Sequence, residues 1–193
     1  MAGRTVVVLG GGVGGLVAAN ELRRRLDRRD RVVLVERGAR HLFQPSLLWL
    51  MVGRRRRERI ERQLRSLLAN GVELVEAEVR TVDPQARQVE TATGVLSADA
   101  LVVALGAELA PDAVAGYRDA ALNFFSPDGA AACARALGSF RGGRVVVAVS
   151  ALPYKCRPPP TRRPSCWTTS CAGAASARRA RSTSSRRNHS RCP

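Results

Sequence analysis

Five glycines within six residues, interrupted only by Val13, follow the first apolar segment of the chain. That segment, Thr5–Leu9, is rich in β-branched side chains, which favour an extended strand. Beyond the glycines, four apolar residues recur at helical spacing: Leu16, Ala19, Leu22 and Leu26. The pattern predicts a strand, a tight turn and a helix at the start of the chain.

Three of the glycines, Gly10, Gly12 and Gly15, have the spacing G-x-G-x-x-G between that strand and that helix. A bound pyrophosphate needs close approach to the backbone and N–H donors at a helix N-terminus. In such a loop the first glycine makes the turn, the second lets the backbone reach the phosphates, and the third lets the helix pack on the strand. We therefore expect a dinucleotide phosphate loop, rather than a glycine-rich turn with a structural role alone.

A second apolar run, Arg31–Glu36, contains four consecutive aliphatic residues and is typical of a parallel strand buried on both faces. It ends in Glu36, which lies 21 residues beyond Gly15. A carboxylate at this position can accept hydrogen bonds from the ribose hydroxyls of a dinucleotide. The strand, glycine loop, helix, second strand and terminal acid together predict a dinucleotide site.

The middle of the chain predicts a loop, a helix and a small sheet. An aromatic and proline-containing loop at residues 41–53 precedes an amphipathic helix that ends at Asn70-Gly71 and carries Ile60, Leu64, Leu67 and Leu68 on one face. Short strands at 72–75, 79–82 and 88–91, with turns at Asp83-Pro84 and Gly94, resemble a small β-meander.

Three further elements are predicted before the composition changes. They are a buried strand at Leu101–Ala104, a helix near Gly129–Leu137, and a buried strand at Arg144–Val149 that looks like the start of another α/β unit. After Cys156 the chain is dominated by Arg, Pro, Ser, Thr and Cys, and no period of 2 or 3.6 runs through its last 37 residues. No fold is predicted for that tail.

The glycine loop, Val32–Arg37, the meander and Ala100–Ala107 together resemble flavoproteins with two dinucleotide-binding domains, the pyridine nucleotide-disulfide oxidoreductase superfamily. In that family the first glycine motif holds FAD. The resemblance implies FAD contacts at Gly10, Gly12, Val13, Gly14, Gly15, Glu36, Arg37, Val79, Ala104 and Gly106.

The resemblance also implies a fold class and a domain organisation. We expect an α/β protein whose residues 1–112 form a Rossmann-type FAD-binding domain with a parallel sheet and a small β-meander. Residues 113–156 would be a connector and the first strand of a truncated second dinucleotide-binding domain, and residues 157–193 a disordered tail.

Within that superfamily, Phe43-Gln44-Pro45-Ser46 with Trp49 and Gly53, and then Pro153-Tyr154-Lys155-Cys156, look like the sulfide:quinone oxidoreductase and flavocytochrome c sulfide dehydrogenase branch. This implies that Cys156 is the catalytic redox cysteine: sulfide is oxidised at its thiol beside FAD, and electrons pass to a quinone. A small buried cysteine at a strand end is the alternative for Cys156. Cys133, between two alanines on the predicted helix, is interpreted as core.

Two other functions stay open. A type II NADH dehydrogenase-like NADH:quinone reductase would share the fold but would not need a cysteine at position 156. A basic nucleic-acid-binding protein would explain the net charge of +16, but the tail offers no recognised motif and no aromatic stacking platform. Nine of the arginines lie in residues 157–193, which contain no acid, so more than half of the excess charge is in the tail. We expect no nucleic-acid partner.

An arginine-rich segment, Arg54–Arg57 with Arg59, Arg62 and Arg65, is either a solvated helix face or a basic patch that contacts anionic lipid. Only four residues precede the first apolar run, which is too short for a signal peptide, and no stretch has the roughly 18 apolar residues of a spanning helix. We therefore expect a cytoplasmic protein, with peripheral contact to the cytoplasmic membrane in its full-length form.

No metal site is predicted. His41 and His189 have no neighbouring residues of the kind that bind metals, and Cys166 and Cys171 are spaced wrongly for a zinc knuckle.

The composition of the tail is that of a GC-rich coding strand translated out of frame. The neighbouring frame after Cys156 permits a sequence that predicts a helix followed by a strand, as expected for this branch, so we infer the loss of one nucleotide just after codon 156. The loss is either a biological frameshift or a sequencing error, and the alternative to it is a genuine disordered basic tail. The fragment would retain FAD weakly or not at all and be inactive, and re-sequencing the locus tests the inference.

Overall fold

The computed structural model describes residues 3–148, and Cys156 and the tail lie outside the described residues. The chain divides into two compact units, of which the described parts are residues 3–47 with 55–110 and residues 48–54 with 111–148. The first unit contains β1 (Thr5–Leu9), α1 (Val13–Arg25), β2 (Arg31–Glu36), β3 (Arg40–Leu42), η1 (Gln44–Ser46), α3 (Arg57–Ile60), β4 (Glu61–Gln63), η2 (Leu64–Leu67), β5 (Val72–Glu76), β6 (Val79–Asp83), β7 (Gln88–Thr91), β8 (Gly94–Ser97) and β9 (Ala100–Val103). Leu47 begins α2 (Leu47–Met51), and η3 (Pro111–Ala113), α4 (Tyr117–Ala120) and α5 (Pro127–Ser139) belong to the second unit.

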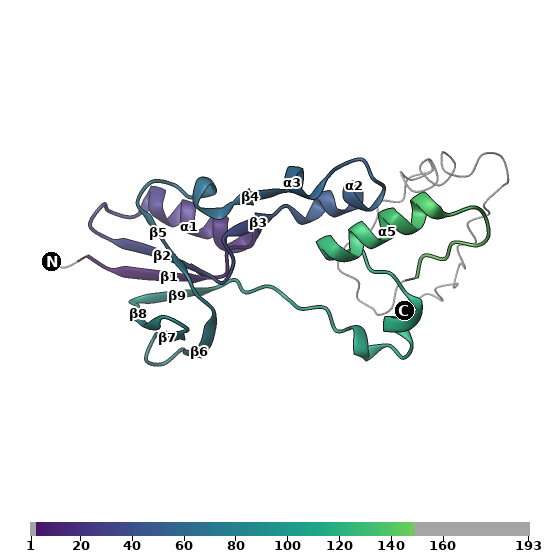
Figure 1. The fold of residues 1–193 in the computed structure, drawn as a ribbon. Coiled ribbons are helices and arrows are strands. Elements are labelled where there is room, and N and C mark those ends of the chain that lie inside the picture. Colours follow the sequence, from purple (N-terminus) through teal and green to yellow (C-terminus); the bar gives the residue numbers. More distant parts are fainter. Residues whose placement is uncertain (1–2, 149–193) are drawn as a thin grey trace, which may run out of the picture. The chain divides into compact units, whose positions relative to one another are not determined.

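A four-stranded parallel sheet in the order β5-β2-β1-β9 forms the centre of the first unit (Figure 1). Val6 pairs with Val32 on one side and with Ala100 on the other. Aliphatic residues fill the central strands because both faces of the sheet are covered, and Val7, Val8 and Leu9 are completely buried. The predicted α/β fold with a parallel sheet is confirmed.

Helix α1 covers one face of this sheet, where a buried cluster contains Val8, Ala19, Val32, Leu34 and Leu64. Asn20 joins the helix to the end of η2 and the residues after it, because its amide donates to Leu67 O (2.9 Å) and its Oδ1 accepts from Ala69 N (2.8 Å).

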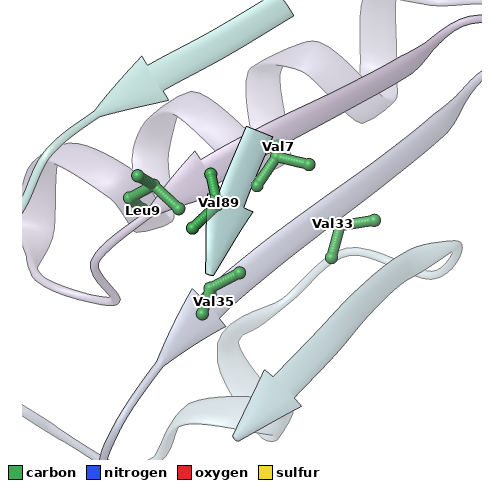
Figure 2. Close-up of a cluster of buried hydrophobic side chains, with 5 residues drawn as sticks. All are labelled: Val7, Leu9, Val33, Val35 and Val89. Atoms are coloured by element: carbon green, nitrogen blue, oxygen red, sulfur yellow. The ribbon is translucent and has the colours of Figure 1, made fainter. Parts of the chain in front are cut away.

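The antiparallel meander β6-β7-β8 covers the opposite face (Figure 1). Figure 2 shows Val89 of β7 facing Val7, Leu9, Val33 and Val35 of the central strands. The predicted meander is present, but its membership differs from the expectation. Residues 72–75, expected as its first strand, lie in β5 of the parallel sheet, where Val72 pairs with Val32.

The prediction of a single amphipathic helix around residues 60–68 is wrong. Its place is taken by α3, β4 and η2, and β4 pairs antiparallel with β3 so that Leu42 lies opposite Glu61. Ile60 and Leu64 are buried as their spacing implies, but they lie at the end of α3 and the start of η2, on either side of β4. Hydrogen bonds between β4 and β3 favour the observed structure over a continuous helix, and the local periodicity of the sequence carries no information about them.

Helix α5 in the second unit confirms the helix predicted near Gly129–Leu137, but it begins two residues earlier, at Pro127. Ser126 caps it, with Oγ accepting from Gly129 N at 3.1 Å, and Pro127 occupies the first turn. The strand expected at Arg144–Val149 is wrong for the described residues 144–148, which form no ladder and leave Val146 74% exposed. An isolated extended segment has no neighbour to satisfy its backbone groups, and no described strand pairs with it.

Candidate functional site

Two glycines of the loop are required by packing within the protein. Gly10 has a φ of +99°, and a Cβ added there would lie 2.5 Å from Ala104 O. A Cβ on Gly15 would lie 1.8 Å from Gly10 O, so α1 could not start where it does with any other residue. Gly10 also donates its N–H to Val35 O at 2.8 Å. The turn and the start of the helix therefore depend on these two positions.

Gly12 is different because nothing in the protein requires a glycine there. Its φ of −66° is open to any residue, and a Cβ would meet no atom within 4 Å. The residue is exposed and forms the N-cap of α1. A side chain would instead fill the space beside the first turn of the helix, which is the space that a ligand approaching the backbone needs.

The N-terminus of α1 has the electrostatics of an anion site. No side chain caps it and its first turn contains no acid, whereas three arginines stand in its last turn. Gly12, Val13 and Gly14 are exposed, so the first N–H groups of a 13-residue helix face solvent. Such a terminus favours phosphate oxygens over water.

Glu36 ends β2 beside this loop. Its Oε2 accepts from Gly11 N at 2.6 Å, and its Oε1 accepts from Gly38 N at 3.2 Å. A Cβ on Gly11 would lie 2.9 Å from Glu36 Cγ, so this glycine too is required by packing. The neighbouring Arg37 is exposed and makes no hydrogen bond or ion pair with the described residues.

The segment after β9 closes the other side of the loop. Ala104 donates its N–H to Leu9 O at 2.8 Å, and a Cβ on Gly14 would lie 3.9 Å from Ala104 Cβ. Gly106 is exposed with a φ of +79°. Val79 is half-buried and packs against the cluster that contains Leu9 and Val35. Most of the predicted FAD contacts thus lie around the carboxyl ends of β1, β2 and β9.

Sequence reasoning missed His41, which β3 places against the same loop. Its side chain is buried, and its Nδ1 lies 2.9 Å from Gly11 O. The two residues are 30 positions apart, and no local pattern connects them. Only its position shortly after the acid that ends β2 would have drawn attention to it.

The ribbon that carries His41 is held by a buried carboxylate on β4. Burial raises the pKa of Glu61, but hydrogen bonds from Arg57 and Arg40 together outweigh that effect, and the net pKa is below its usual value. The contacts are 2.6 Å from Arg57 Nε and 2.9 Å from Arg40 Nε. Glu61 is therefore ionised at neutral pH and anchors β3 to β4.

The predicted catalytic cysteine, Cys156, lies outside the described residues, and its role stays a prediction. Cys133, expected in the core, is buried on α5, and burial raises the pKa of its thiol. Within residues 3–148 no three His, Cys, Asp or Glu side chains form a group that could hold a metal ion. No helix in the same range is long and apolar enough to cross a membrane.

Known proteins share this architecture. The family model of the pyridine nucleotide-disulphide oxidoreductases matches residues 4–149. Mitochondrial sulfide:quinone oxidoreductase of Mus musculus is 33% identical over 115 residues, which cover 58% of this chain and 25% of that protein. The chain thus spans about a quarter of the length of this relative.

Two solved structures are similar. Sulfide:quinone oxidoreductase from Aquifex aeolicus superposes with a TM-score of 0.60 at 26% identity, covering 69% of this chain and 31% of that one. NDH2 from Plasmodium falciparum superposes with a TM-score of 0.57 at 20% identity, covering 70% and 29%, and shares the fold alone. The chain therefore belongs to the pyridine nucleotide-disulphide oxidoreductase family of FAD-dependent enzymes, as the glycine loop and the strand pattern predicted.

Proposed function

We propose that residues 10–15 and 36 hold the pyrophosphate and adenosine ribose of FAD in a sulfide:quinone oxidoreductase-like enzyme. The observation that carries the proposal is the open space at Gly12, at a helix N-terminus that no side chain caps. The exposed N–H groups there are donors for phosphate oxygens. Glu36 supplies carboxylate oxygens beside the loop for ribose hydroxyls.

The other contacts in the proposed site are Arg37, Val79, Ala104 and Gly106. Arg37 is an exposed cation beside the loop, available to a phosphate. When bound, FAD supplies a carrier for a hydride or for two electrons. The chain's own contribution in this region is to bind and orient the cofactor.

The proposed reaction oxidises sulfide at the thiol of Cys156 and passes the electrons to a quinone. Support comes from the likeness to sulfide:quinone oxidoreductases of mouse and Aquifex aeolicus. We propose residues 1–112 as the FAD-binding domain, 113–156 as the connector to an incomplete second domain, and 157–193 as an out-of-frame tail.

The cofactor site is tested by titrating the 193-residue chain with FAD and following flavin fluorescence. Saturable binding that weakens at least tenfold in Gly12→Ala is expected, because a Cβ would occupy the phosphate space. Gly138→Ala is the control, since a Cβ there also meets no atom within 4 Å but lies on α5. Equal FAD binding by Gly12→Ala and Gly138→Ala would count against the site.

The reaction is tested in a frame-restored protein that contains the second domain. Sulfide should reduce the bound flavin, and Cys156→Ser should abolish that reduction while leaving FAD bound. Reduction by NADH without reduction by sulfide would favour the alternative, an NADH:quinone reductase.

We also propose a cytoplasmic location with peripheral membrane contact through the arginine-rich segment. Its described members in the first unit are exposed: Arg55, Arg56, Arg57, Arg59, Arg62 and Arg65. Clustered arginines near a membrane attract anionic lipid. Sedimentation with vesicles containing phosphatidylserine, compared with phosphatidylcholine alone, tests this contact.

A further inference from the structure

The glycine loop is held by hydrogen bonds at nearly every peptide group before the helix. Gly10 N–H donates to Val35 O and Gly11 N–H to Glu36 Oε2, while Gly12 O accepts from Leu16 N. The remaining group is the peptide between Gly11 and Gly12. Its carbonyl oxygen lies 2.9 Å from His41 Nδ1.

The chemistry of this contact sets the direction of the hydrogen bond. A carbonyl oxygen can only accept, so His41 must donate from Nδ1. Both the neutral Nδ1–H tautomer and the imidazolium can do so. The ring is buried and comes from the middle residue of β3, whose backbone is paired with Arg62 of β4. The donor is therefore positioned by the ribbon and not by the loop.

The contact has a consequence for Gly12. A trans peptide group is planar, and its C=O and N–H point in opposite directions. Holding Gly11 O towards His41 therefore turns the N–H of Gly12 away from the ring. That N–H belongs to the exposed N-cap residue, where no Cβ fills the space beside the helix.

We infer that His41 is a positioning residue for the phosphate loop: it orients the Gly11–Gly12 peptide so that Gly12 N–H faces the FAD pyrophosphate. The inference rests on the proposed FAD site. His41 itself touches the carbonyl of Gly11 and needs no contact with the cofactor. Leu64, the first residue of η2 directly after β4, also lies against Gly11, because a Cβ added at Gly11 would be 2.6 Å from its Cδ2.

A pair of substitutions separates donation at Nδ1 from the presence of a polar side chain. The amide nitrogen of Asn reaches the position of Nδ1, whereas that of Gln reaches the position of Nε2. His41→Asn should therefore bind FAD within about threefold of the wild type, and His41→Gln and His41→Ala about tenfold more weakly, as expected for one lost hydrogen bond. Equal FAD dissociation constants for the Asn and Gln variants, or an unchanged constant for the Ala variant, would overturn the inference.

A second measurement needs no FAD. In the ligand-free chain labelled with ¹⁵N, the Nδ1–H proton of His41 should be observed as a slowly exchanging resonance, assigned by its loss in His41→Asn. The Gly12 amide resonance should broaden in His41→Gln but not in His41→Asn. A His41 ring protonated only at Nε2 would overturn the inference even if the chain binds no FAD, whereas equal FAD binding by Gly12→Ala and Gly138→Ala would count against the proposed site alone.

Discussion

The carboxylate of Glu36 accepts the backbone N–H of Gly11 at 2.6 Å, which joins the end of β2 to the middle of the glycine loop. The same carboxylate accepts from Gly38 N through its other oxygen. An ionised carboxylate has about four lone-pair sites, so two amide contacts leave acceptors for ribose hydroxyls. The acid predicted as a ribose ligand is thus also part of the loop's own framework.

Glu36→Ala should lower both the stability of the ligand-free chain and the affinity for FAD. The loss of an acceptor leaves Gly11 N–H without its partner, at a cost of about 1–3 kcal/mol in unfolding free energy. FAD affinity should fall at least tenfold, because the ribose contact is lost as well. Denaturant unfolding and fluorescence titration measure the two effects.

Glu76→Ala is the matched control for this prediction. Glu76 lies opposite Glu36 in the ladder between β2 and β5, but its side chain is exposed. Removal of the Glu76 side chain should change neither the unfolding free energy nor the free energy of FAD binding by more than about 0.5 kcal/mol. Similar losses in both variants would show that Glu36 has no special role.

Gly15→Ala should destabilise the fold, whereas Gly12→Ala should not. A Cβ at position 15 would lie 1.8 Å from Gly10 O, and relieving that clash must move the backbone of the loop or the helix, at a cost of about 3 kcal/mol or more. A Cβ at position 12 meets nothing, so the stability should change by less than about 1 kcal/mol. Urea unfolding compares the two, and equal stabilities would contradict the packing argument.

Glu61→Gln should destabilise the chain by about 1–2 kcal/mol at pH 7, because Arg40 and Arg57 lose a buried ionised partner. The pKa of Glu61 in the folded chain is below its ordinary value of 4.5. Its ionised form therefore contributes stability above about pH 4.5, and that contribution is lost as the pH falls through the folded pKa. Unfolding free energies measured from pH 7 down to pH 3 should converge for the two proteins.

Glu73→Gln serves as the exposed comparison. Its hydrogen bond and ion pair with Arg31 lower the pKa of Glu73, but both side chains are more than half exposed. The substitution should cost less than about 1 kcal/mol, since exposed ion pairs contribute little. A larger loss of unfolding free energy for Glu73→Gln than for Glu61→Gln would contradict the stronger stabilising role given to Glu61.

The thiol of Cys133 should react slowly with a disulfide reagent at neutral pH. It is buried, its Sγ lies 3.7 Å from Asn123 O, and burial raises its pKa, so little thiolate is present or accessible. In a variant whose other four cysteines are serine, the reaction with Ellman's reagent should accelerate at least tenfold on unfolding in guanidinium chloride. A rate that does not change on unfolding would contradict the burial.

Local sequence patterns were sufficient to predict the elements whose structure depends on residues close together in the chain. Thr5–Leu9 and Arg31–Glu36 were predicted with the bounds of β1 and β2, because continuous aliphatic runs suit strands covered on both faces. The start of α1 followed from Gly15, which permits the close contact with Gly10 O. The family, and with it the FAD cofactor, could be recognised from the same segments.

Local sequence patterns gave the wrong secondary structure where the apolar side chains of a segment could be buried in two different ways. Ile60 and Leu64 could be buried on one continuous helix or, as observed, on either side of β4, and the choice depended on hydrogen bonds between β4 and β3. Residues 72–75 alternate like a meander strand, but β2 offers them a parallel partner. Spacing along the chain does not report which partner a strand finds.

The sequence by itself determined the glycine loop and its flanking strands, because turn geometry and helix packing there depend on contacts within a few residues. Only the tertiary structure decided what holds the loop in place. Glu36 and His41 reach Gly11 from 25 and 30 residues away, along strands whose pairing sets the positions of their side chains. Contacts at that separation arise from strand pairing, which a local pattern cannot specify.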